Sequence, residues 1–536
     1  MKRLTNVEEV EDARRRLKEA LEARGRWFLR ERRDGAGVEL RSGEWELRTA
    51  GTALVFSYWG EAGGRAWRVA AWRREGERIV LDASRRMGAE RARLELAPGA
   101  SFASARAAVA EARRRECERV AAFVCEAARA RLGGAVKLER AVLSAGARRG
   151  EPGRWARVHL RRGRELFIAT APVVVVGAEA VESFIASALM WLARLEGGPK
   201  QEARPRALWL VAPRALAEAA RERVALLRES LRALVSVFEF DEGDGVSNQL
   251  EGDGVSSELE VAGVLRQLRV PELEELLEAR APRLFRQTPA PACELTERVV
   301  SLAPESVDFV RARRGETLRF NGLAFARVRR LFEEERAWFG VGAASRRRVL
   351  DEATAAEFVK LIRELKEHRR AGAPDAKHAF YRAAPEAWLE SILRRDITRL
   401  DAGLRLAPLH AQFRASRVGA AASRPVDLLA LRRDGRLVVI ELKVSEDSAL
   451  ALQGADYWRR VEAQRRAGNI TRARLFGDAL IADEPPLVYL VAPMLRFHRS
   501  FDALARAVRP EIEMYRYDLS EDWRASVRVV RRRRLD

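Results

Sequence analysis

The chain has 536 residues, 47% of them hydrophobic and 33% charged, which is the balance of a globular protein with enough length for several domains. Its formal net charge of +21 points to a polyanionic partner. The longest apolar run, which starts at Phe167, is about half as long as a bilayer span, and the charged N-terminus lacks a signal-peptide core. Three scattered cysteines give neither a disulfide framework nor a zinc spacing, so we expect a cytoplasmic protein with no membrane partner.

The positive charge has two explanations. The chain contains eight lysines and 91 arginines. Such enrichment is expected of a nucleic-acid-binding protein, but it also follows from genome base composition. The densest basic cluster, residues 528–536, could bind phosphate or could be a solvated tail.

Residues 1–100 are predicted to form a β-rich domain with a leading helix. Residues 1–27 have the pattern of an amphipathic helix, and residues 38–97 are short β-forming segments broken by glycine turns, as in a β-meander or small barrel. Four tryptophans there could stack on bases, but we favour core positions for most of them: Trp45, Trp59, Trp67 and Trp72.

The middle of the chain divides into three predicted parts. Residues 101–243 begin with a helix from about Ser104 to Arg131 and continue as strands alternating with helices. Residues 244–259 lie in a tandem duplication, EGDGVSNQL and EGDGVSSEL, which lacks the ligand spacing of a calcium loop and is predicted to be an exposed linker. Residues 260–375 form a connecting α+β region in which no chemistry stands out.

The most informative segment follows Arg424. VDLLAL and RLVVIELKV are rich in β-forming residues and flank the turn signal RDG, which predicts a hairpin. A three-residue loop with Gly435 in the left-handed conformation would place Asp427 opposite Glu441. Lys443 would share their face by strand periodicity. A two-residue loop would instead turn Asp427 to the other face.

The chemistry of these three groups predicts a metal site. A carboxylate within LVVIELKV is costly to bury unless it is paired or bound to a metal. Two converging carboxylates suit Mg²⁺, which takes phosphate oxygens as further ligands and lowers the pKa of a bound water. Lys443 could orient that water, deprotonate it or stabilise the transition state. The alternative is that Glu441 and Lys443 form an exposed ion pair on a sheet surface.

These motifs resemble those of the PD-(D/E)XK nuclease superfamily, whose members have a restriction-endonuclease-like fold. RPVD, ending at Asp427, resembles the "PD" element with Val426 at the consensus proline position. IELK, from Ile440, is similar to the (D/E)XK element. QGADY, from Gln453 to Tyr457, resembles the Q-x-x-x-Y element of the RecB-like branch. The resemblance covers roughly residues 376 to 500.

The resemblance implies a mixed sheet flanked by helices over residues 376–536, with Mg²⁺ as the cofactor and Mn²⁺ as an alternative. It assigns Asp427 and Glu441 as metal ligands, Lys443 as catalytic, and Gln453 and Tyr457 near the metal and substrate. It also implies a glutamate on a preceding helix that contributes to the metal site. PEAWLESILRR offers Glu390, which we favour, and Glu386.

A degenerate second copy of this module is a further hypothesis. Residues 156–176 align without gaps to residues 427–447, and ALWLVAP, ending at Pro213, is similar to VYLVAP, ending at Pro493. In this alignment Ala156, Thr170 and Pro172 replace the three catalytic groups. Such a copy could not bind the metal in the same way. A chance match between two strand–turn–strand segments is the alternative.

The sequence therefore predicts an α/β multidomain protein whose last domain is a metal-dependent nuclease hydrolysing phosphodiester bonds, with DNA as the expected partner. One alternative is a non-catalytic nucleic-acid-binding protein with a nuclease-like fold. Another is an RNA endonuclease on the same scaffold. The sequence leaves a homodimer open.

Overall fold

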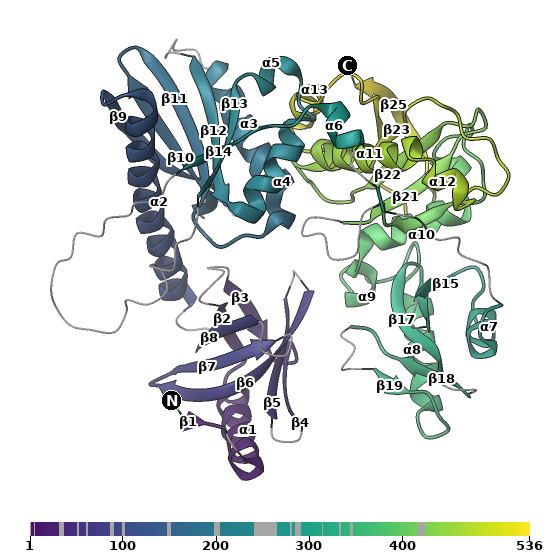
Figure 1. Ribbon diagram of the computed structural model, residues 1–536. Helices are drawn as coiled ribbons and strands as arrows, with labels where there is room; N and C mark the ends of the chain where they lie inside the picture. The colour runs from purple at the N-terminus through teal and green to yellow at the C-terminus, as the bar shows by residue number, and fades with distance from the viewer. Residues whose placement is uncertain are drawn as a thin grey trace. The chain divides into compact units, whose positions relative to one another are not determined.

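The computed structural model describes most of the chain, and among the described residues the fold is mixed α/β, with four sheets and 13 α-helices (Figure 1). The chain forms two compact units: residues 1–177, 198–214 and 238–266, and residues 178–197, 215–237 and 267–536. The described residues are 2–4, 6–31, 37–50, 53–60, 63–85, 90–98, 102–146, 152–197, 204–240, 265–278, 281–282, 284, 291–312, 315–331, 334–342, 347–415 and 424–535.

The first unit begins with an antiparallel sheet covered by helix α1 (Val7–Glu22), which confirms the leading helix and the β-rich region. The apolar face of α1 packs with the buried side of the sheet in one hydrophobic cluster. Trp67 is buried in this cluster, and Trp45 and Trp72 pack against it, as expected of core residues. The strands are β1 (Lys2–Arg3), β2 (Arg26–Glu31), β3 (Gly37–Arg41), β4 (Trp45–Ala50), β5 (Ala53–Gly60), β6 (Gly63–Glu75), β7 (Arg78–Arg85) and β8 (Glu90–Pro98).

A second sheet has the order β14-β13-β12-β11-β10-β9. Helix α2 (Phe102–Leu132), which was expected at Ser104–Arg131, packs against it through Ala121, Val124 and Ala128. The strands are β9 (Val136–Ala145), β10 (Pro152–Arg162), β11 (Glu165–Pro172), β12 (Pro205–Pro213), β13 (Val235–Phe240) and β14 (Arg266–Leu268). The connections contain α3 (Val181–Glu196), α4 (Arg214–Val224) and α5 (Glu229–Arg232).

A small antiparallel sheet, β15 to β19, precedes the last module. Its core contains Phe320, Phe325 and Phe339 and is closed by Phe358 of helix α8 (Ala355–His368). The strands are β15 (Val307–Ala312), β16 (Gly315–Phe320), β17 (Leu323–Leu331), β18 (Glu334–Phe339) and β19 (Arg348–Val349), and the preceding helices are α6 (Leu273–Glu278) and α7 (Glu294–Ser301).

The last sheet runs in the order β20-β21-β22-β23-β24-β25, with a buried cluster on each face. Strand β22 is antiparallel to β21 and parallel to β23. The strands are β20 (His410–Phe413), β21 (Val426–Leu431), β22 (Leu437–Leu442), β23 (Leu487–Pro493), β24 (Met514–Leu519) and β25 (Val529–Leu535). The helices are α9 (Ala379–Arg382), α10 (Pro385–Arg395), α11 (Leu450–Arg466), α12 (Asn469–Arg472) and α13 (Phe501–Arg506).

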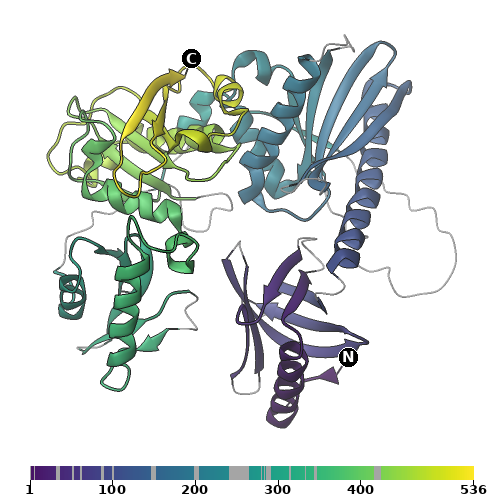
Figure 2. The same cartoon turned by 180° about the vertical axis from the view of Figure 1, so that it is seen from behind.

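The basic segment at the C-terminus forms strand β25, so it is not a tail. Figure 2 shows this strand in yellow, and it pairs antiparallel with β24 at the edge of the sheet. Arg532 lies over the ring of Tyr515, and Arg533 pairs with Asp502. At least four arginines of the cluster, Arg528, Arg532, Arg533 and Arg534, therefore have partners within the protein.

The two six-stranded sheets share the predicted order of strand, strand, helix, strand. In both, the first two strands are antiparallel and the third is parallel to the second. Thr170 pairs with Leu210 and Glu441 with Leu490, so the LVAP segments stand at the same level. This agreement supports the hypothesis of a degenerate copy.

The gap-free alignment is wrong in the first strand, because the two hairpins have loops of different length. Arg162 pairs with Glu165, which leaves a two-residue loop, and Arg157 stands opposite Thr170. Arg157, and not Ala156, therefore occupies the position corresponding to Asp427.

Some predictions from the sequence are not tested by the structure. The duplicated EGDGVS segments lie outside them. The proposed domain boundaries at 100, 243, 259 and 375 remain predictions. In the described parts of the chain, no helix is both long and apolar enough to cross a membrane.

Candidate active site

The hairpin of β21 and β22 places Asp427 level with Glu441. Arg432 N donates to Arg436 O at 2.9 Å, which closes the predicted three-residue loop, and Gly435 has a φ of +89°. Leu428 pairs with Ile440 and Leu431 with Leu437, and the same register brings Asp427 opposite Glu441. The backbone amide of Leu442 donates to Asp427 Oδ2 at 2.9 Å. The predicted three-residue loop, which was chosen because it places Asp427 opposite Glu441, is confirmed.

Lys443 and Glu441 form an ion pair that is not exposed. Lys443 Nζ donates to Glu441 Oε1 at 2.7 Å, and the two side chains are 19% and 2% exposed. Burial, followed by the nearby Asp427 carboxylate, raises the pKa of Glu441 well above its usual value. Burial alone would lower the pKa of Lys443, but the carboxylates of Glu441 and Asp427 raise it. Lys443 is therefore an ammonium donor in this arrangement.

Gln412 of β20 joins the site from the neighbouring strand. Its Nε2 donates to Glu390 Oε2 at 2.9 Å and to Asp427 Oδ1 at 3.2 Å. Its backbone has a φ of +51°, a region that side chains rarely adopt. Ala411 packs with one core cluster and Phe413 with the other, so the strand's alternation is interrupted at Gln412. The strained residue thereby links two acidic groups of the site.

Glu390, the favoured helix glutamate, is buried on α10, whereas Glu386 is half-buried. Arg319 of β16 donates from Nη1 to Glu390 Oε1 at 3.1 Å. Burial raises the pKa of Glu390, while Arg319 and the amide of Gln412 oppose this shift. Of the two glutamates, Glu390 is the one that connects to Asp427 through Gln412.

Helix α11, which carries Gln453 and Tyr457, packs on the face of the sheet to which Glu441 belongs. Gly454 makes this close approach possible, because a Cβ there would stand 2.7 Å from Leu490 Cδ2 and 2.9 Å from Val488 Cγ1. Tyr457 packs with Leu429, Leu437 and Val439, the apolar neighbours of the site. Burial, followed by the carboxylates of Glu441 and Asp427, raises the pKa of Tyr457, so its hydroxyl remains protonated.

The carboxylate and amide oxygens of the site bear on whether it can hold a divalent cation. Within the described residues, no three His, Cys, Asp or Glu side chains gather closely enough to hold a metal, so Glu390 as a third ligand remains a prediction. Among the predicted site residues, two buried oxygens have no hydrogen-bond donor: Glu441 Oε2 and Gln453 Oε1. Buried acceptors are normally satisfied, and Mg²⁺ can bind through one or two carboxylates plus waters and phosphates. Asp427 and Glu441 therefore fit such an ion.

Sequence reasoning missed Gln412 and Arg319. Gln412 lies in HAQF, which carries no motif, and Arg319 lies 108 residues before Asp427 in a region without apparent chemistry. Had HAQF been recognised as a strand that pairs with VDLLAL, the pairing would have placed Gln412 near Asp427. No sequence signal indicates Arg319.

In the comparisons with known proteins, no protein-family model, curated protein or solved structure matches this chain. The resemblance to PD-(D/E)XK nucleases thus rests on the short motifs alone.

Proposed function

We propose that the protein is a metal-dependent nuclease that hydrolyses phosphodiester bonds, with DNA as its substrate. The observation that supports this most is the group of buried Glu441 and half-buried Asp427 and Lys443, in which one oxygen of Glu441 has no hydrogen-bond donor. A buried carboxylate that lies level with a second acid and keeps one oxygen without a donor costs stability, and a bound cation would offset that cost. The net charge of +21 favours a polyanionic substrate.

Each residue has a distinct proposed role. Asp427 and Glu441 hold the cation, which when bound supplies an acidified water and neutralises charge on the phosphate. The Lys443 ammonium, 2.7 Å from Glu441 Oε1, orients the attacking water or donates to the phosphate oxygen on which charge develops. Gln412 keeps Asp427 and Glu390 in place, and Gln453 directs its unpartnered carbonyl oxygen towards water or cation.

Two alternatives share the fold but differ in outcome. An RNA endonuclease would use the same groups, since the phosphodiester chemistry is common to both polymers. A non-catalytic binding protein would need only the positive surface. The two neighbouring carboxylates of Asp427 and Glu441 argue against the second alternative, because carboxylates weaken phosphate binding in the absence of a cation.

The test is cleavage of supercoiled plasmid and of structured RNA with Mg²⁺, with Mn²⁺ and with a chelator. We expect plasmid cleavage that needs the divalent ion and is lost in Asp427→Asn and Glu441→Gln. Glu446→Gln is the matched control, because Glu446 is exposed five residues beyond Glu441. Cleavage of RNA alone would favour the first alternative. Binding of either polymer without cleavage would favour the second.

A further inference from the structure

Helix α11 contains a buried acid that the proposed reaction does not use. Asp456 lies between Gln453 and Tyr457 and is 0% exposed. It pairs with Arg459 of the same helix at 2.8 Å, with Arg460, and with Arg223 of α4 at 3.0 Å. Although burial alone would raise it, these guanidinium groups hold the pKa of Asp456 far below its ordinary value. Asp456 is therefore a permanent buried anion.

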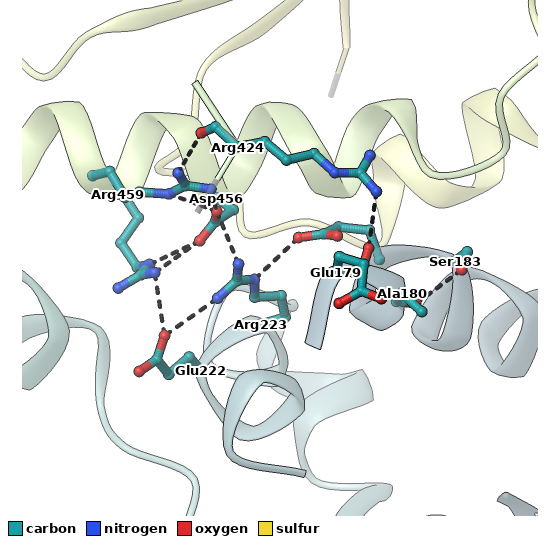
Figure 3. A network of polar contacts seen from close by, with 10 residues as sticks. Glu179, Ala180, Ser183, Glu222, Arg223, Arg424, Asp456 and Arg459 are labelled. Atoms are coloured by element: carbon teal, nitrogen blue, oxygen red, sulfur yellow. Dashed lines mark hydrogen bonds and ion pairs between the residues drawn. The ribbon is translucent and has the colours of Figure 1, made fainter. Parts of the chain in front are cut away.

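Arg223 is the centre of this network, which is drawn in Figure 3. Each of its three guanidinium nitrogens contacts a different acid: Nη2 contacts Asp456 at 3.0 Å, Nε contacts Glu182 of α3 at 3.3 Å, and Nη1 contacts Glu222 at 3.2 Å. Its side chain is 4% exposed. Only a planar, forked group can serve three partners in this way.

The network also reaches the strand that carries Asp427. Arg460 Nη1 donates to the backbone oxygen of Arg424 at 2.8 Å, and Arg424 Nη2 donates to the backbone oxygen of Glu179 at 2.9 Å (Figure 3). Arg424 stands three residues before Asp427. The same cluster of charges thus ties down both the helix bearing Gln453 and Tyr457 and the entry to β21.

Glu182 connects the network to the duplication. By the offset of 271 residues that relates Thr170 to Glu441, Glu182 corresponds to Gln453. The degenerate module lacks the groups for hydrolysis, and at this position it has a carboxylate, in place of the amide of Gln453, that is buried against Arg223. Burying so many charges is costly, and their removal one at a time would leave the others uncompensated. A positional role explains why the whole set is present.

We propose that Arg223 is a positioning residue, through which helices α3 and α4 of the degenerate module fix α11 relative to Glu441. The expected loss of cleavage rate rests on the proposed nuclease function, whereas the positioning of α11 does not. Loss of Arg223 frees α11 to shift, and a displacement of about 1 Å at a reacting centre can lower the rate roughly 100-fold. Substrate affinity, which comes from phosphate contacts over the surface, is unaffected.

The experiment compares Arg223→Met and Arg223→Lys with Arg221→Met in the full-length protein. Arg221 is a matched control, because it lies on α4 and its side chain pairs with Glu218 of the same helix. Steady-state cleavage over a range of substrate concentrations is measured at a temperature where circular dichroism shows every variant folded. Backbone hydrogen exchange of residues 450–466 is followed beside that of α8.

We expect Arg223→Met to lower kcat by at least roughly tenfold with KM unchanged, and to speed exchange in α11 but not in α8. Arg223→Lys, which keeps the charge but cannot reach three acids, should restore part of kcat and remains informative if the methionine variant does not fold. A merely stabilising role would lower the melting temperature while kcat per folded molecule and α11 exchange stayed as in wild type. That result would overturn the inference. If the wild-type protein cleaves nothing, the nuclease proposal fails, and the exchange measurement still decides whether Arg223 holds α11.

Discussion

Gln412 stands beside Asp427 with its backbone in the left-handed region, and its amide nitrogen is 3.2 Å from Asp427 Oδ1. The same nitrogen is 2.9 Å from Glu390 Oε2. One strained residue on an edge strand therefore holds two acidic side chains that lie 37 residues apart in the sequence.

This geometry predicts different outcomes for two small substitutions. Gln412→Ala and Gln412→Gly both remove the amide, so both should slow cleavage by at least roughly tenfold. Glycine accepts a positive φ without strain, so Gln412→Gly should be more stable than Gln412→Ala by about 1 kcal/mol. Urea denaturation beside single-turnover cleavage measures both effects. Equal stability of the two variants would show that the strain is absent in solution.

The hairpin could be predicted from the sequence because its signals are local. VDLLAL, RDG and RLVVIELKV fix two strands and a turn, and the need to bring Asp427 level with Glu441 selects the loop. Gln412 and Arg319 could not be predicted in this way, because strand pairing and tertiary packing bring them to the site. The position of Arg157 was missed for another reason. The first hairpin has a loop one residue shorter, which shifts the pairing of β10 with β11 by one residue, and the gap-free alignment does not reveal this shift.

Gly454 is predicted to control the distance of α11 from the sheet. In Gly454→Ala the new methyl group would meet Leu490 and Val488, an overpacking cost of about 1–3 kcal/mol. The better helix propensity of alanine than of glycine offsets about 1 kcal/mol of this cost. We expect a net loss of stability and a lower kcat, because Gln453 and Tyr457 move outwards. In a Leu490→Ala background the same substitution should cost less. An equal cost in both backgrounds would contradict the close approach.

The pH dependence of metal binding follows from the raised pKa of Glu441. A cation must displace the proton from this buried carboxyl, so Mn²⁺ affinity should increase with pH well above about 4.3, where ordinary glutamates titrate. In the metal-free protein the stability of the fold should instead decrease as the pH rises. A raised folded-state pKa contributes stability below the unfolded pKa, and this contribution is lost as the pH rises through the folded pKa.

Calorimetry with Mn²⁺ between pH 5 and pH 8 tests this expectation, and the melting temperature without metal is followed over the same range. Glu441→Gln should remove the pH dependence of Mn²⁺ binding and reduce that of the melting temperature, whereas Glu446→Gln should leave both unchanged. Mn²⁺ binding of equal strength in wild type and Glu441→Gln would place the cation elsewhere.

Lys443 provides the most direct test of the nuclease proposal. If it orients the attacking water or stabilises developing charge, Lys443→Ala should abolish cleavage and leave nucleic-acid binding largely intact, because affinity comes from many phosphate contacts. Lys443→Arg keeps the charge but introduces a longer, planar head that cannot take the place of the ammonium 2.7 Å from Glu441 Oε1, so it should be nearly as damaging.

The decisive measurement is single-turnover cleavage of a labelled duplex by wild type, Lys443→Ala and Lys443→Arg, beside a binding titration with each protein. We predict cleavage by the wild type alone and similar dissociation constants for all three. Full cleavage by both variants would contradict the nuclease proposal, since Lys443 would then be only an ion-pair partner of Glu441.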